Sequence, residues 1–161
     1  GSTAKAAFGR KGGRALVGEL KATRPPRAGR TRKNQHFGLH LTLDGYLADP
    51  KKLNDRGLIV KVLGDLPRKM GMQRLIVPRV VRAPDNGLKD PGGWSGFVII
   101  QESHISIHTF PRRRFVSIDV YSCKDFNPRP IRRYFRRLFG VRKFENHLVV
   151  RGTQYPHYNL A

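Results

Sequence analysis

Three short runs rich in β-branched and aromatic residues follow one another almost without a break in the second half of the chain. They span residues 96–102, 104–110 and 115–123, and each has the length and composition of a strand. Connections this short are typical of hairpins between antiparallel strands, because parallel strands need a long crossover. The chain is therefore predicted to build an antiparallel sheet around these three strands.

Further strands are predicted on both sides of this central region. Residues 37–43 carry four apolar residues that alternate with polar or small ones, which is the period of a half-buried strand. Shorter stretches at 75–81 and 144–151 also read as strands. The segment between 83 and 93 is rich in Pro, Asp, Asn and Gly and is predicted to be a long loop.

Two helices are predicted along the same stretch of chain. The first spans about residues 50–70, with Asp49 as its N-cap and Pro50 in its first turn, although two glycines and a proline inside it weaken it. The second begins after Asn127 and ends at Gly140, and its apolar residues follow helical spacing. Strands in hairpin succession with two amphipathic helices predict an α+β fold: a two-layer sandwich of an antiparallel sheet with helices on one face.

The chain divides by composition into an arm and one folded domain. Residues 1–36 are strongly basic, contain a single acid, Glu19, and include paired glycines and prolines, so they are predicted to be a flexible N-terminal arm. Residues 37–161 hold the predicted strands and helices. A domain of this size can bury a modest core.

The net charge of +21 at pH 7 points to polyanions as partners. Besides the arm, the second predicted helix carries a row of arginines without an acid among them. Contact with RNA or another polyanion through these two regions is one interpretation, and a solvated basic surface is the other. The arginines are Arg129, Arg132, Arg133, Arg136 and Arg137.

Two other features bear on where the protein works. No apolar run approaches the roughly 20 residues of a membrane span, so no membrane association is expected. The one cysteine, Cys123, cannot form an internal disulfide, and this favours a reducing, cytoplasmic setting. The spacing of the histidines and Cys123 matches no metal site.

Reactive side chains are concentrated on the central strands. Glu102-Ser103-His104 and, shortly after, His108 lie on one predicted strand, and Cys123 follows the next. A serine hydroxyl can attack the preceding carbonyl, and elimination of the resulting ester would cleave the chain and leave a pyruvoyl group. That ketone forms a Schiff base with an amine and acts as an electron sink for decarboxylation. A base and an acid must move the protons.

The run from Gly93 to Pro111 and the segment from Ser117 to Cys123 resemble the prokaryotic S-adenosylmethionine decarboxylases, which are pyruvoyl-dependent proenzymes. The shared signature is Ser-Gly, then Glu-Ser-His-Ile-Ser-Ile-His-Thr, then a cysteine, and the likeness extends over about residues 37–151. The resemblance implies a two-layer sandwich, a homodimer with active sites near the interface, and S-adenosylmethionine decarboxylation for spermidine and other polyamine synthesis.

The resemblance also implies a role for each matching residue. Glu102–Ser103 would be the bond that cleaves autocatalytically, with Ser103 becoming the covalent pyruvoyl cofactor; no metal is implied. Ser95 and His108 match residues that assist processing, and Cys123 matches the proton donor in turnover. Phe37 matches an adenine-stacking aromatic more loosely, and His104 is predicted to line the site beside the cleavage bond.

Two features do not fit the family pattern simply. Strict alternation puts Ser103 and His108 on opposite faces of a strand, so a bulge or the processing break is expected between them. Family members also place a glutamate that binds the substrate ribose where this chain has Arg112. Decarboxylation of the small amino acids L-arginine or L-ornithine is therefore one alternative, and a non-catalytic protein recruited to RNA or a ribonucleoprotein is another.

Overall fold

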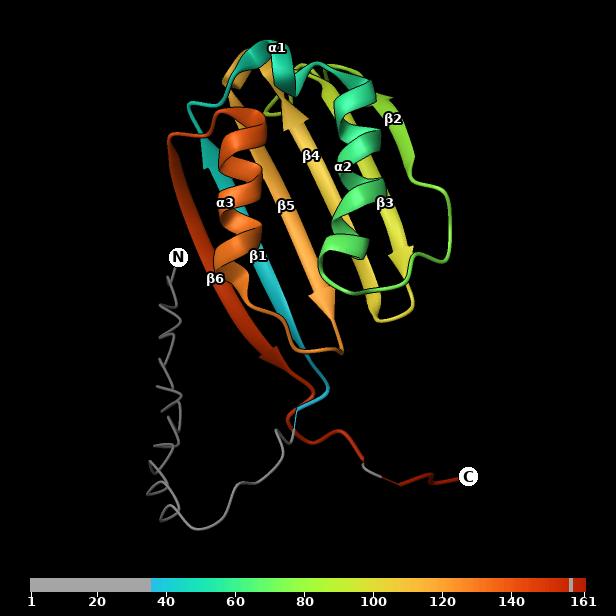
Figure 1. Cartoon of the computed structure of the whole chain (residues 1–161). Helices are drawn as coiled ribbons and strands as arrows, with labels where there is room; N and C mark the ends of the chain where they lie inside the picture. The colour runs from blue at the N-terminus through green and yellow to red at the C-terminus, as the bar shows by residue number, and fades with distance from the viewer. Residues whose placement is uncertain (1–35, 157) are drawn as a thin grey trace, which may run out of the picture. The chain divides into compact units, whose positions relative to one another are not determined.

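The computed structural model describes residues 36–156 and 158–161, so the predicted arm lies outside the described residues apart from His36. A single six-stranded sheet organises this part of the chain, in the order β2-β3-β4-β5-β1-β6, and every strand pair is antiparallel (Figure 1). The strands are β1 (Gly38–Tyr46), β2 (Arg79–Ala83), β3 (Gly93–Ile100), β4 (Ser103–Phe110), β5 (Phe115–Ser122) and β6 (Lys143–Arg151).

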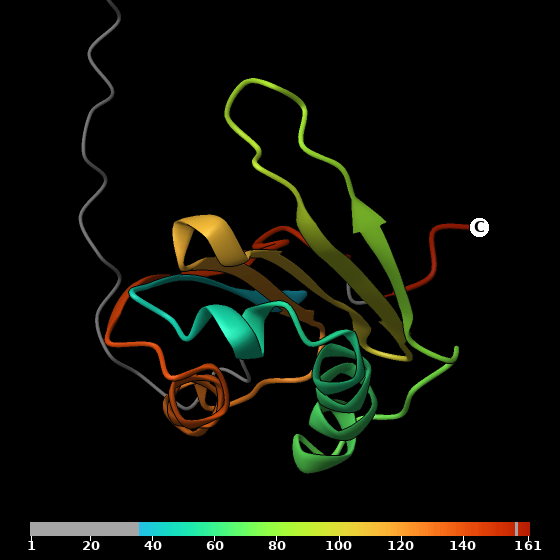
Figure 2. The same ribbon diagram turned by 90° about the horizontal axis from the view of Figure 1, so that it is seen from above.

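The helices lie together on one face of the sheet, and the other face is left open. Figure 2 shows α1, α2 and α3 on the same side, with the β2–β3 loop and the 3-10 turn η1 rising on the opposite side. The predicted two-layer α+β sandwich is confirmed. The bounds are α1 (Pro50–Leu53), α2 (Arg56–Lys69), η1 (Pro111–Arg113) and α3 (Pro128–Phe139).

The core fills the space between the helices and the sheet. Alternate strand residues such as Leu41, Ile105 and Ile118 are buried beneath α2 and α3. They belong to one core cluster with buried helix residues such as Leu63 and Phe135. Burying side chains of this size contributes about 1.5–3 kcal/mol each before the entropy of ordering them is counted. Because the period along a strand is two, the intervening residues all face the open side.

Gly96 shows how closely α2 approaches the sheet. A Cβ atom at this position of β3 would lie 2.7 Å from Leu63 Cδ1 and 3.0 Å from Ile107 Cγ2. Any side chain here would therefore push the helix away from the sheet. The glycine allows the tight contact.

Two element predictions were wrong. The helix predicted over residues 50–70 is broken into α1 and α2, because Asp55 leaves the helix and caps α2 through the Leu58 N–H, 3.0 Å away. The strand predicted at 75–81 instead runs from Arg79 to Ala83. Pro78 has no N–H to donate to a ladder, and the residues before it make only isolated bonds, such as Leu75 N to Ile99 O.

Among the described residues, no helix is both long and apolar enough to cross a membrane.

Candidate active site

The Glu102–Ser103 bond lies in a tight turn at one end of the sheet. Ile100 and Ser103 are partners in the β3–β4 register, so Gln101 and Glu102 form a two-residue hairpin loop. The turn is held by bonds from Gln101 N to Gln73 O at 2.8 Å and from Gln73 N to the Glu102 carboxylate at 3.3 Å. Ser103 has a φ of 148°, a conformation that favours glycine, and such residues store on the order of 1–3 kcal/mol of strain.

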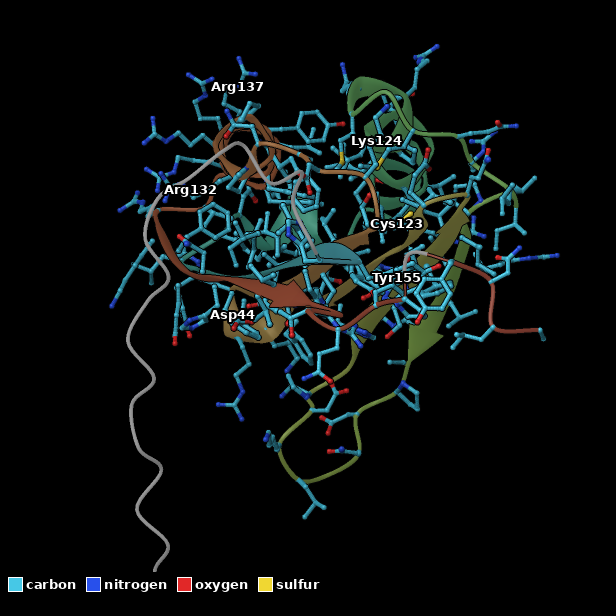
Figure 3. All side chains as sticks on the ribbon, turned by 90° about the horizontal axis from the view of Figure 1, so that it is seen from below. Asp44, Cys123, Lys124, Arg132, Arg137 and Tyr155 are labelled. Carbon is cyan, nitrogen blue, oxygen red and sulfur yellow. The ribbon has the colours of Figure 1, made fainter. Side chains whose placement is uncertain are left out.

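Cys123 follows directly on β5 and donates its backbone N–H to the Glu102 carbonyl oxygen at 2.8 Å. This is the carbonyl that the Ser103 hydroxyl would attack, and a fixed donor stabilises the negative charge that develops on its oxygen. The Cys123 thiol is free and exposed, and Figure 3 labels the residue next to Lys124, just after the end of β5. The turn at Gln101 and Glu102, Ser103, and the backbone N–H and thiol of Cys123 therefore form one group, called here the Ser103 end.

Ser95 and His108 form a second group. They are partners in the β3–β4 register, both on the open face, and the Ser95 hydroxyl and His108 Nδ1 are hydrogen bonded at 3.0 Å. The bond fixes the orientation of an imidazole that is exposed to solvent. A histidine held in this way can act as a general base or acid.

The two groups lie far apart within one chain. His108 is five residues beyond Ser103, which is about 17 Å along a strand. The register of β4 against β5 runs unbroken from Ser103 to Phe110, so the expected bulge does not occur. Ser103 is also in line with the buried Ile105 and Ile107, whereas His108 is on the other face.

Arg112 belongs to this second group, called here the His108 end. It lies in η1, and its Nη1 atom donates to Asp85 Oδ2 at 2.9 Å, joining η1 to the loop between β2 and β3. Both side chains are well exposed, at 73% for Arg112 and 48% for Asp85. The pair is worth little stability, but it directs the guanidinium towards the loop and neutralises part of its charge.

His104 lies beside Ser103 on the open face, packed among aromatic residues. Its ring stacks on Phe97 with centroids 5.4 Å apart and meets the edge of Tyr121 at 5.6 Å. Burial, and next the neighbouring His40, lower the pKa of His104 below its usual range, so it is neutral at neutral pH. It is a hydrogen-bonding or packing group of the site, not a cation.

Phe37 borders an open hollow near the Ser103 end. The hollow has a volume of about 570 Å³, and its walls include Tyr121 and Tyr155. The ring of Phe37 lies 4.7 Å from that of Tyr155, and the Arg151 guanidinium lies 4.3 Å above the ring of Tyr121. Tyr121 pairs with His104 in the β4–β5 register, one position from Ser103, so this aromatic surface lies near the candidate cleavage bond.

Sequence reasoning missed several residues of these groups. His40 is bonded to Asp119 at 2.8 Å on the open face beside His104, and both lie at alternate positions of their strands, so strand periodicity could have found them. Asp85 is 27 residues from Arg112, and nothing local in the sequence marks that contact. Among the described residues, no group of three or more His, Cys, Asp or Glu side chains could hold a metal ion.

Comparison with solved structures defines the class of fold. The crystal structure of the adenosylmethionine decarboxylase from Aquifex aeolicus matches with a TM-score of 0.63 over 77% of this chain and 98% of that one, at 24% identity. At that identity the likeness shows the fold alone, a sheet with helices packed against it.

Sequence comparison is more specific. The family model for S-adenosylmethionine decarboxylase matches residues 39–152. A proenzyme of that name from Geobacillus kaustophilus is 35% identical over 118 residues, covering 73% of this chain and 90% of the relative. One from Clostridium botulinum is 32% identical over 119 residues, covering 73% and 97%. The chain belongs to the S-adenosylmethionine decarboxylase family, as the sequence motif predicted.

Proposed function

We propose that this chain is a self-processing proenzyme that cleaves before Ser103 and then decarboxylates S-adenosylmethionine for polyamine synthesis. Two relatives that bear that name are matched over 90% and 97% of their own length. The observation that carries the cleavage step is the strained turn in which the Glu102 carbonyl already accepts the Cys123 N–H at 2.8 Å. Decarboxylation of arginine or ornithine has no comparable support among these relatives.

The cleavage is written from the groups at the Ser103 end. The Ser103 hydroxyl attacks the Glu102 carbonyl carbon, its proton leaves, and the peptide C–N bond breaks to give an ester and a free amine. A base then removes the Ser103 α-proton, the ester C–O bond breaks and Glu102 leaves as a carboxylate. The resulting enamine becomes an imine, which water hydrolyses to ammonia and an N-terminal pyruvoyl group. The strain at Ser103 is released when the chain is cut.

The residues around the turn fit such a group. A terminal ketone binds the amine of an amino acid and withdraws the electron pair left when carbon dioxide departs. Cys123 is exposed beside the turn, where its thiol can return a proton to the product carbon. His104 is neutral and walls the open face next to Ser103.

The base in this scheme has to come from a second chain. His108 and Ser95 lie about 17 Å from Ser103 along the same strand, so one chain cannot bring them together. We therefore propose a homodimer in which the His108 end on the open face of one protomer reaches the Ser103 turn at the end of the other protomer's sheet. Exposed apolar side chains on this face suit such a contact. They are Val81, Phe97, Ile99 and Val149.

The activity is tested with purified chain incubated with carboxyl-labelled S-adenosylmethionine, arginine and ornithine in parallel. Mass spectrometry should show two fragments divided before Ser103, and labelled carbon dioxide should come from S-adenosylmethionine. Protein that stays intact on ageing contradicts the cleavage step. Cleaved protein that releases carbon dioxide only from an amino acid contradicts the substrate.

The dimer is tested by mixing two inactive variants. A Ser103→Ala chain lacks the nucleophile but keeps His108, and a His108→Ala chain does the opposite. Unfolding and refolding them together should produce mixed dimers in which the His108→Ala chain is cleaved. If neither chain is cleaved in the mixture, although both fold and dimerise, the shared site is wrong.

A further inference from the structure

The outward side of α3 is a continuous arginine surface, called here the α3 arginine face. Its five arginines are all exposed, while Ile131, Phe135 and Phe139 on the opposite side are buried in the core. Figure 3 shows Arg132 and Arg137 projecting away from the helix. The arginines of the face are Arg129, Arg132, Arg133, Arg136 and Arg137.

These charges are not neutralised by acids of the described part of the chain. None of the ion pairs found between residues 36 and 161 involves an arginine of α3. Arg132 donates to the Asn146 side-chain oxygen at 3.1 Å, and Arg136 lies 5.8 Å from the ring centroid of Phe144. Guanidinium groups one turn apart on a helix repel each other, so a bound polyanion would stabilise the face.

The apolar side of α3 excludes one kind of anionic partner. A helix that binds a lipid surface inserts its apolar side between the headgroups, whereas that side of α3 is already packed on the sheet. The five side chains are all arginine, whose planar fork binds phosphate oxygens in pairs. Twelve helical residues extend about 18 Å, a length over which one nucleic-acid strand carries about five phosphates.

We propose that the α3 arginine face binds the phosphate backbone of nucleic acid without sequence preference. The neighbouring aromatic ring supports a backbone contact, because Lys69 Nζ lies 5.7 Å from the centroid of Tyr134 and occupies the ring that a base would stack on. The face lies on the helix side of the sheet, opposite the open face (Figure 2), so binding leaves the candidate active site accessible. This proposal does not rest on the proposed function.

The test measures binding of the full chain to a fluorescent single-stranded 20-nucleotide RNA by anisotropy, across a range of salt concentrations. The variant Arg132→Gln/Arg133→Gln/Arg137→Gln removes three phosphate contacts. Its slope of log affinity against log salt should be shallower by about 2, and at 0.1 M salt its affinity should fall on the order of 100-fold. A Lys52→Gln/Arg56→Gln/Lys89→Gln control loses the same charge from exposed sites on α1, α2 and the β2–β3 loop.

The control should keep most of the affinity. The variant Arg132→Lys/Arg133→Lys/Arg137→Lys should also keep most of it, because it retains the charges, and this result would show that α3 still folds when these three positions are substituted. Equal losses in the α3 variant and the control would overturn the proposal, since net charge alone would then explain binding. Unchanged RNA binding by the α3 variant would also overturn it. So would equally tight binding to a polyglutamate of matched charge, or binding to anionic vesicles but not to RNA.

Discussion

The two ends of β4 differ in how they are built. At the Ser103 end the important contacts are made by the backbone: a strained turn, and a carbonyl held by an amide of the neighbouring strand. At the His108 end they are made by side chains, with Ser95 orienting His108 and Asp85 holding Arg112. Under the proposed function, the Ser103 end generates the electrophile and the His108 end supplies the base for its formation.

Replacing Ser103 by Ala should have the largest effect, because it removes the nucleophile of the Ser103 end. Cleavage and carbon dioxide release should both be lost entirely, as measured by mass spectrometry and label release. Ser106→Ala, three residues along the same strand, is the matched control and should still cleave. Cleavage before residue 103 in the Ser103→Ala protein would show that the turn is cut by another route.

Cys123→Ser should separate the two functions of the Ser103 end. The backbone N–H that holds the Glu102 carbonyl is unchanged, so the chain should still be cleaved. A hydroxyl is a much weaker acid than a thiol, so turnover of S-adenosylmethionine should drop by about 100-fold or more. If cleavage is slowed while turnover of the cleaved fraction is normal, the thiol acts in processing instead.

Arg112→Gln should have a smaller effect at the His108 end. The exposed pair with Asp85 contributes at most about 1 kcal/mol, and its loss frees a carboxylate near a cationic substrate. KM for S-adenosylmethionine should fall by up to about fivefold, with kcat unchanged, and the difference should shrink in 0.5 M salt. A tenfold rise in KM would show that Arg112 contacts the substrate directly.

The sequence predicted five of the six strands of the sheet and the motif residues at both ends, because strand periodicity and a long motif carry that information. It failed where a single residue decides between local alternatives, as Asp55 does in breaking the predicted helix and Pro78 in delaying β2. Ser95 precedes the turn at Gln101 and Glu102 by as many residues as His108 follows it. The two residues are therefore register partners, and their contact can be predicted once the turn is known. The Arg112–Asp85 contact depends on the path of a loop, which no periodicity encodes.

The smallest predicted effect concerns His104. Its pKa is lowered in the folded state, so on acidification the unfolded chain takes up its proton first and the folded state loses stability as pH falls below about 6.5. Burial is the largest cause of the lowered pKa; His40 and Arg151 also lower it, and Asp119 raises it. The unchanged protein should have a lower Tm at pH 5.5 than at pH 7.5, and in His104→Gln this drop should be about 2 °C smaller. The exposed His147→Gln control should not show this gain, and an equal gain there would place the acid sensitivity outside the Ser103 end.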